Sequence, residues 1–165
     1  MLRSLVIVCT LFGAGSCVIA AQASVRVEAA NLQGPRPLEE QTATAAIRDY
    51  LQSWKTLGSA LEENRADLLD RDFVGSARDK LTDTIQQQSK LGIQTSYRDR
   101  AHDLQIVFYS PDGLSIELTD AAEYDVQVID HNNVQTTQRV SARYIVVLTP
   151  AELRWRVRVF QAAAL

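Results

Sequence analysis

One stretch, residues 104–118, constrains the fold more than any other part of the sequence. It shows two alternating apolar and polar segments joined by a Pro-Asp-Gly turn, and the glycine suits the left-handed position of a three-residue loop with a bulge. This turn predicts that Phe108 lies opposite Ile116 and Ile106 opposite Leu118, with all four side chains on one face of a sheet. The hairpin predicts architecture and carries no chemistry of its own.

The first 23 residues predict a signal peptide. Positively charged Arg3 precedes an uncharged apolar run, and small residues at Ala21 and Ala23 suit a signal peptidase that cleaves before Ser24. We therefore expect an exported bacterial protein, periplasmic or secreted. Two alternatives would tie the chain to a membrane: the run is close to the lower limit of about 17 residues for a retained anchor, and small residues before Cys17 loosely resemble a lipidation site, without its usual leucine.

Composition excludes several classes of function. Both cysteines, Cys9 and Cys17, lie in the signal segment, so the mature chain has no disulfide and no cysteine metal ligand. The net charge of −3 argues against a nucleic-acid binder. No Walker loop, dinucleotide fingerprint, nucleophile elbow or His-x-x-x-His pair is present, so we expect no cofactor and no metal. The mature length fits one domain.

Three helices are predicted to precede the sheet. We expect residues 24–36 to form a flexible tether, because they are small, polar and charged and end in Gly-Pro-Arg-Pro. Apolar residues at steps of three and four predict a first helix over residues 37–63, starting at a proline. A short helix over 66–70 follows, and a third over 72–91 has Asp72 as its N-cap.

Beyond Gly92 the apolar period changes from 3.6 to 2, which predicts strands. The predicted strands cover residues 93–109, 114–129, 134–148 and 153–163. Two further turns predict cross-strand pairs that keep one face buried: Tyr124 with Val140, Leu118 with Val146, Leu148 with Leu153, and Val146 with Trp155. The expected domain, residues 37–165, is an α+β fold with three helices packed on one face of a curved four-stranded antiparallel meander.

Arginines gather on the opposite face of that sheet. Arg154, Arg156 and Arg158 alternate along the last strand, and the predicted register places Arg158 opposite Arg143. It also places Asp125 opposite Arg139. A solvated sheet face is the ordinary explanation. The alternative is a docking patch for an acidic partner, because like charges opposite each other cost stability unless something neutralises them.

Several short matches along the chain resemble one superfamily. They are Trp54-Lys55 and Leu57-Gly58 in the first helix, Leu68-Leu69 after it, Tyr97 before the sheet, and Leu153-Arg-Trp-Arg-Val157 in the last strand. With the order of helices and strands, they resemble the nuclear transport factor 2-like (cystatin-like) superfamily, and more narrowly the C-terminal intermembrane-space domain of plastid-division proteins and its bacterial relatives. We expect this protein to lack the long N-terminal region that those division proteins carry, which separates its role from theirs. The resemblance implies a sheet curled into a cone that holds a ligand, catalyses a reaction or serves as an interaction surface.

Candidate site residues face the inside of that cone. Aromatic residues there could line a ligand pocket, although aromatics in a core usually only pack: they are Tyr50, Trp54, Tyr124, Tyr144 and Trp155. Asp120 is the one inward carboxylate of the predicted strands and a candidate general base, with a bulge or turn aspartate as the alternative. His102 is a second candidate, but its neighbour Asp103 should point to the opposite face. His131 falls in a turn and is expected to be solvated.

We therefore predict a non-catalytic binding domain of the cell envelope that contacts a partner protein or a small ligand. The arginine face or the aromatic-lined cone would make the contact. A small enzyme of the isomerase or cyclase type, acting inside the cone, is the alternative. The sequence leaves the ligand, the oligomeric state (a homodimer is one option) and the pathway open.

Overall fold

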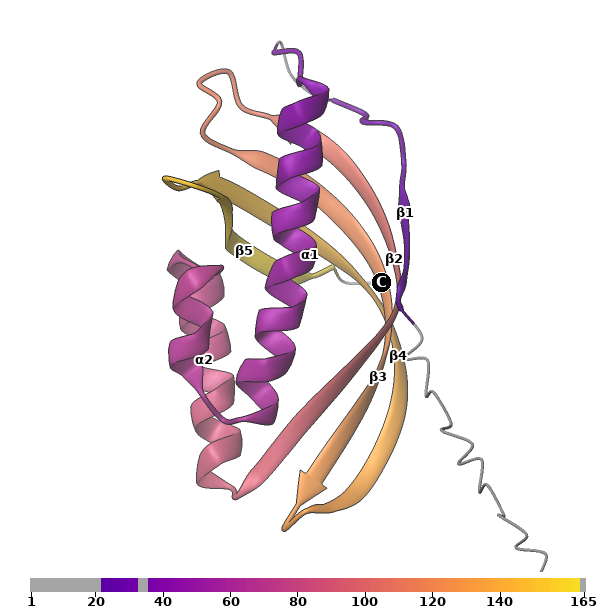
Figure 1. The fold of residues 1–165 in the computed structure, drawn as a ribbon, viewed down its shortest axis with the longest axis vertical. Coiled ribbons are helices and arrows are strands. Elements are labelled where there is room, and N and C mark those ends of the chain that lie inside the picture. Colours follow the sequence, from indigo (N-terminus) through magenta and orange to yellow (C-terminus); the bar gives the residue numbers. More distant parts are fainter. Residues whose placement is uncertain (1–21, 33–35, 164–165) are drawn as a thin grey trace, which may run out of the picture.

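The structure, a computed structural model, describes residues 22–32 and 36–163. Its centre is a five-stranded sheet with the order β1-β2-β3-β4-β5, curled around two α-helices (Figure 1). Cys17 and the apolar run of the predicted signal peptide lie outside the described residues. Within them, no helix is long and apolar enough to cross a membrane.

The helical part differs from the prediction in number and in bounds. Helix α1 spans Glu40–Glu62 and α2 spans Gly75–Lys90, whereas the short segment Ala66–Arg71 between them, where a short helix was predicted, is a 3-10 helix, η1. The described residues thus hold two α-helices, and the prediction of three helices was wrong. Pro37 precedes α1 by three residues, with Glu39 at the N-cap. Asp72 is not the N-cap of α2, which is Val74, because the Asp72 carboxylate is buried among other partners.

The sheet has one strand more than predicted. Strands β2 (Ile93–Tyr109), β3 (Ile116–Asp130), β4 (Asn133–Pro150) and β5 (Trp155–Ala162) form the expected antiparallel meander. Strand β1 (Ser24–Val27) adds to its edge parallel to β2. It falls inside the predicted tether, so that prediction was wrong for these residues. The reason is visible in the sequence Ser-Val-Arg-Val, in which two β-branched residues alternate with polar ones.

The registers confirm part of the predicted pairing. Ile106 lies opposite Leu118, and the predicted partners Tyr124–Val140, Leu118–Val146 and Asp125–Arg139 also pair. A bulge between Ile106 and Phe108 moves Phe108 opposite Glu117, and Tyr109 takes the core place opposite Ile116. Gly113 has the expected left-handed conformation, with φ 78°.

The last hairpin is shifted from its predicted register. Leu148 pairs with Val157 and not with Leu153, and Val146 pairs with Phe160 and not with Trp155. The connection between β4 and β5, residues 151–154, lies two residues further along the chain than predicted, because β4 continues to Pro150 and β5 begins only at Trp155. A shift between Val147 and Leu148 makes Arg158 a bulge residue with no partner opposite it in β4.

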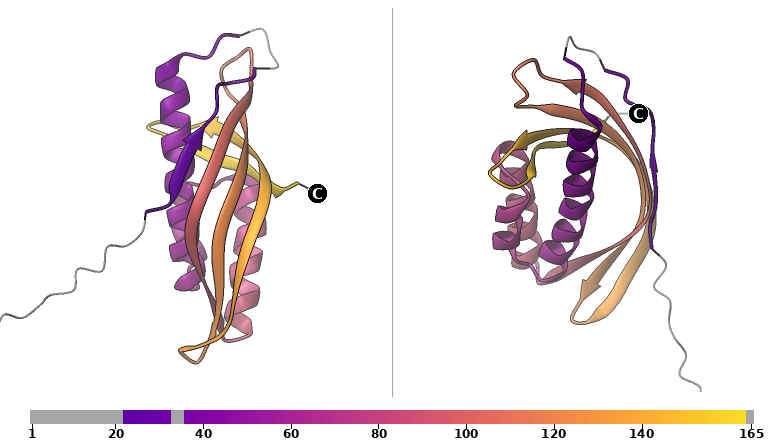
Figure 2. Two further views of the ribbon diagram at one scale, coloured as in Figure 1. Left: turned by 90° about the vertical axis from the view of Figure 1, so that its right-hand side faces the viewer. Right: turned by 45° about the horizontal axis from the view of Figure 1, so that its top comes forward.

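The core lies between the concave face of the sheet and the helices. Figure 2 shows that the sheet wraps α1, with α2 on the far side of α1 at the mouth of the curve. Helix α1 contributes a buried stripe at helical spacing that includes Tyr50, Trp54, Leu57 and Leu61. The strands contribute alternating residues of β2, β3 and β4 to the same core. This arrangement places the middle of α1 directly over the inward side chains of the sheet.

Candidate functional site

A buried polar cluster lies in the middle of the cone. The Tyr50 hydroxyl donates to Asp120 Oδ2 at 2.6 Å, and His102 Nδ1 lies 2.9 Å from the same oxygen. The indole N–H of Trp54 donates to the Tyr50 hydroxyl at 2.8 Å. The structure therefore brings both weak catalytic candidates, Asp120 and His102, into one hydrogen-bonded chain with two predicted pocket residues.

Sheet geometry explains why these residues meet. His102 and Asp120 point to the concave face of β2 and β3, two register steps apart, while Asp103 points to the convex face as expected. Tyr50 and Trp54 are one turn apart on α1, so both reach the same place. Asp120 sits in a regular part of β3, so the expected irregularity around it was wrong. The bulge lies in β2, between Asp99 and Ala101.

The electrostatics of the cluster favour a charged imidazole. Burial alone would lower the pKa of His102, but hydrogen bonds and negative charge from Asp120 and Asp99 outweigh it and raise the pKa to about 9. Burial next to Asp120 raises the pKa of Tyr50 well above its usual value, so this hydroxyl stays protonated. The imidazole of His102 and the phenol of Tyr50 thus share one oxygen of Asp120, whereas the other oxygen, Oδ1, has no hydrogen-bond partner among the described residues.

Aromatic rings close the cone over this cluster. The Trp54 ring lies 5.1 Å from His102 and 5.5 Å from Tyr124, measured between ring centroids. Tyr144 and Phe160 stack on each other at 4.6 Å and both contact Trp54 edge-on. Such arrangements are typical of packed aromatic cores.

The rim of the aromatic cluster is also tied by hydrogen bonds. The hydroxyls of Tyr124 and Tyr144 are 2.6 Å apart. Burial is the main cause that raises the pKa of Tyr97 to about 12, so its phenol is neutral. Trp155, the fifth pocket candidate, packs half-buried at the start of β5, where its backbone N–H donates to Asp49 Oδ2 at 2.8 Å.

The polar cluster is closed to solvent. Tyr50 and Asp120 are 0% exposed, and His102 and Trp54 are 3% exposed. The five most prominent hollows on the described part of the molecule are lined by other residues than Tyr50, Trp54 and Asp120. One of about 300 Å³ on the convex face, next to β1, includes His102 among its lining residues.

A second buried carboxylate, Asp72, lies at the mouth of the cone. Thr56 donates to it at 2.5 Å, and the guanidinium groups of Arg71 and Arg154 bind it at 2.9 and 3.2 Å. Burial alone would raise the pKa of Asp72, but Arg71, Thr56 and Arg154 together hold the pKa below its usual value. Sequence reasoning missed this cluster, because its members lie on α1, next to η1 and before β5.

The arginine face is not the regular row that the alternation predicted. Arg154 is bound to Asp72, and Arg156 donates to the backbone oxygens of Asp70 and Phe73. Arg158 and Arg143 are exposed, but they do not lie opposite each other; the N–H of Ala163 donates to the Arg143 carbonyl instead. Two of the four arginines therefore hold the end of η1 and the segment that follows it, residues 70–73, against β5.

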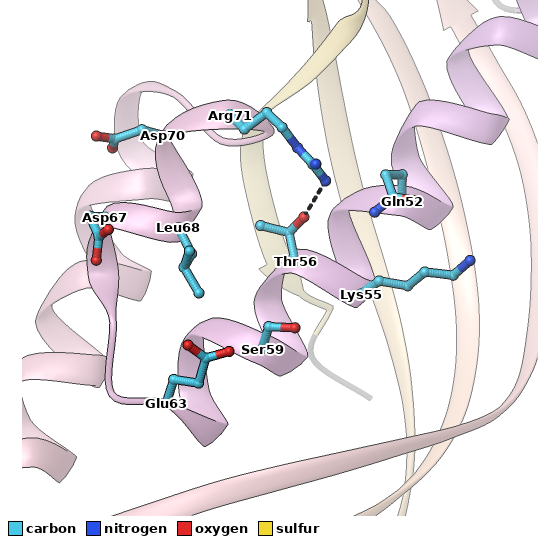
Figure 3. A pocket seen from close by; sticks show the side chains of 9 residues that line it. All are labelled: Gln52, Lys55, Thr56, Ser59, Glu63, Asp67, Leu68, Asp70 and Arg71. Carbon is cyan, nitrogen blue, oxygen red and sulfur yellow. Dashed lines mark hydrogen bonds between the residues drawn. The ribbon is translucent and has the colours of Figure 1, made fainter.

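Two of the hollows along the outer side of α1 also involve a second element. The first, of about 580 Å³, lies between α1 and η1 (Figure 3). Lys55 and Arg71 contribute positive charge there, and Glu63, Asp67 and Asp70 contribute negative charge. Arg71 reaches over it to donate to the Thr56 hydroxyl at 2.9 Å. Because both signs of charge line this hollow, its electrostatics select no particular ligand charge.

The second hollow has a different character. It measures about 550 Å³ and lies between α1 and β1. Val27, Ile47 and Leu51 make its apolar floor, and its charged lining residues, Arg48 and Lys55, are both basic. Ile47 and Leu51 are both only half-buried, because they sit at the margin of α1 that faces β1.

Some predicted sites fall outside the cone. His131 is solvated as expected, with its side chain 90% exposed in the β3–β4 turn. The bond between Ala23 and Ser24, where we predict cleavage, lies directly before β1. Within residues 22–32 and 36–163, no three His, Cys, Asp or Glu side chains are grouped so that they could hold a metal ion.

Comparison with known proteins identifies the fold. No protein-family model matches the sequence, and no curated protein matches it. The intermembrane space region of the chloroplast protein ARC6 is similar in structure, with a TM-score of 0.62, 18% identity, and coverage of 79% of this chain and 99% of that one. A protein from Novosphingobium aromaticivorans with the assigned name scytalone dehydratase matches with a TM-score of 0.52, 12% identity, and coverage of 76% and 89%. At such low sequence identities, structural similarity shows a shared fold and does not show a shared activity. This chain has a nuclear transport factor 2-like fold.

Proposed function

We propose that this protein is an exported binding domain of the bacterial cell envelope, which contacts a partner through its outer surface and performs no chemistry in its cone. The filled cone carries the proposal. An enzyme needs an ionisable group within hydrogen-bond reach of its substrate, whereas Tyr50 and Asp120 have no exposed surface. The open hollows lie along the outer side of α1 instead.

Accessibility of Trp54 tests the filled cone. The chain has two tryptophans, so Trp155→Phe leaves Trp54 as the sole fluorophore. We expect acrylamide to quench its emission about tenfold less efficiently in the folded protein than in denaturant, as for a fully buried indole. Quenching that is equally efficient in both states would mean that the cone opens, and would remove the main support for the proposal.

Export is supported by the N-terminal sequence, and the position of β1 agrees with it. Cleavage before Ser24 would leave every described strand and helix intact, since β1 begins at that residue. N-terminal sequencing of material from the periplasm or the medium should begin at Ser24. A chain recovered with Met1 intact would refute cleavage.

A catalytic role in the cone is the second candidate, and one observation favours it. The contacts of Tyr50 and His102 with Asp120 resemble a proton-transfer group, in which a carboxylate orients an imidazole. Any substrate would have to displace Trp54. Diethyl pyrocarbonate tests this: exposed His131 should react at once and buried His102 should not. Modification of both at similar rates would favour an enzyme of the isomerase or cyclase type.

A further inference from the structure

Strand β1 leaves one backbone edge of the sheet open. It pairs with β2 on one side and is the outermost strand of the sheet order. The N–H of Glu28, which follows it, donates to the Leu104 carbonyl at 2.8 Å. Backbone groups alternate in direction along a strand, so Val25 and Val27 direct theirs away from β2. Natural edges usually carry charges or proline that discourage further pairing.

The side chains on the inner face of this edge are apolar and uncovered. Val25 and Val27 pair in register with His102 and Leu104, so they face the concave side. Yet they are 46% and 51% exposed, while their partners are buried. Strand β1 is the edge strand, and the right-hand view of Figure 2 shows it running along β2, apart from α1. The hollow of about 550 Å³ occupies this place.

The charge around this hollow points to an acidic ligand. Arg48 and Lys55 are about two helical turns apart on the exposed side of α1. The chain as a whole, by contrast, has a net charge of −3. Arg48 contacts Asp49 at 2.9 Å, but that carboxylate also accepts from the Trp155 N–H and is mostly buried. Lys55 makes no ion pair among the described residues.

We propose that the hollow between β1 and α1, here called the β1–α1 groove, receives an extended acidic and aliphatic segment of a partner protein. The segment adds to β1 as a further strand, its apolar side chains pack on Ile47 and Leu51, and its carboxylates lie near Arg48 and Lys55. Main-chain hydrogen bonds supply affinity in such strand additions, and pockets for alternate side chains supply specificity. This inference rests on the proposed binding function and names the class of partner.

A synthetic peptide of alternating glutamate and valine, with a terminal fluorophore, is a suitable probe. We expect its anisotropy to rise on binding to the mature domain, and we expect a peptide with lysine in place of glutamate to bind at least about tenfold more weakly. Hydrogen exchange gives the sharper readout: bound peptide should slow exchange at the amides of Val25 and Val27. Saturable binding that leaves both amides unprotected would overturn strand addition, as would equal affinity for the two peptides.

Charge-reversal pairs locate the contact. Arg48→Glu with Lys55→Glu should weaken the glutamate peptide at least about tenfold. The matched control, Lys80→Glu with Lys90→Glu, makes the same change of charge on α2 and should leave affinity within about twofold. Equal loss in both pairs would show a non-specific charge effect and overturn the groove.

Further arms separate this inference from the proposed function. A partner purified from the envelope that loses affinity with Arg143→Glu and Arg158→Glu, and not with Arg48→Glu and Lys55→Glu, would retain the binding function and overturn the groove. A dimer in sedimentation that dissociates with Arg48→Glu and Lys55→Glu would assign the groove to a second copy and likewise overturn it. Failure of the proposed function would show itself elsewhere, as efficient quenching of Trp54.

Discussion

Two aspartates are buried in this protein, and their surroundings differ in kind. Asp72 is held by two arginines and a threonine at the mouth of the cone, where the arginine side chains are 52% and 38% exposed. Asp120 is held by a tyrosine and a histidine deep inside, where none of the three has appreciable exposure. One carboxylate therefore has partners that water can also solvate, and the other has partners that are themselves buried.

The difference teaches how burial and charge combine. The partners of Asp72 come from α1, the end of η1 and the start of β5, so the cluster joins elements far apart in sequence. The partners of Asp120 are a phenol and an imidazole, and only the imidazole changes charge near neutral pH. The Asp72 cluster should therefore keep its contribution to stability at alkaline pH, and the Asp120 cluster should keep its contribution at acidic pH.

Removal of each carboxylate should give the largest contrast. Asp120→Ala leaves two buried groups without a partner and opens a cavity, and we expect a loss of about 3 to 5 kcal/mol in the free energy of unfolding. Asp72→Ala should cost about 2 kcal/mol, since the two arginines regain water. Urea unfolding monitored by circular dichroism measures both losses. Equal losses would mean that exposure of the partners does not decide the cost.

Alkaline pH should weaken only the inner cluster. The pKa of His102 is raised from 6.5 to about 9 in the folded state, so its contribution is complete below pH 6.5 and is lost as the pH rises through about 9. The free energy of unfolding should fall by about 3 kcal/mol across this window. Asp120→Asn removes the charge with little change of shape and is the matched control. An equally steep fall in that variant would contradict the assignment.

The hydroxyl donors of the two clusters allow a finer comparison. Tyr50→Phe takes a donor from Asp120 and an acceptor from the Trp54 N–H, so it should cost about 2 kcal/mol. Thr56→Val takes one donor from Asp72, which keeps its arginines, and should cost about 1 kcal/mol. Chemical denaturation at pH 6 measures both. A larger loss from Thr56→Val would reverse the ranking of the two clusters.

Acid should produce the smallest effect. It should weaken the outer cluster, around Asp72, whereas alkali weakens the inner one. The pKa of Asp72 is held below its usual 3.8, so its contribution is complete above that pH and is lost as the pH falls through the lower, folded value. Thermal unfolding between pH 5 and 2 should show a steeper loss in wild type than in Asp72→Asn. Identical acid profiles would show that the arginines do not stabilise the charged carboxylate.

The sequence predicted the sheet better than its edges. Periodicity and three turns predicted the meander of β2 to β5 and the inward direction of Asp120 and Tyr124, because alternation along a strand fixes the face. Periodicity could not predict the bulges, because bulges depend on the way in which these long strands bend. Because of the bulge after Ile106, Tyr109 and not Phe108 is buried in the core. Because of the bulge at Arg158, the arginines of β5 do not form the regular row that was predicted.

The candidate site was predictable only in part. Asp120 and His102 were recognisable as inward groups and lie in the same register as the correctly predicted pair Ile106–Leu118. No sequence pattern showed that Tyr50 on α1 would reach the same carboxylate. Strand β1 was missed because four residues give too short a pattern. The Asp72 cluster was missed because Asp72 looked like a helix cap, and because no sequence pattern connects Thr56 with Arg154.

The segment from Asp72 to Val74 also has a bearing on how the chain folds. Its backbone closes the outer edge of β5 through hydrogen bonds in both directions with Val157, at 2.8 and 2.9 Å. Residues in the first half of the described chain thus pair with its last strand. A nascent chain that has not yet reached Trp155 lacks these contacts with β5, so docking of this segment on the sheet should be completed only after β5 has been synthesised.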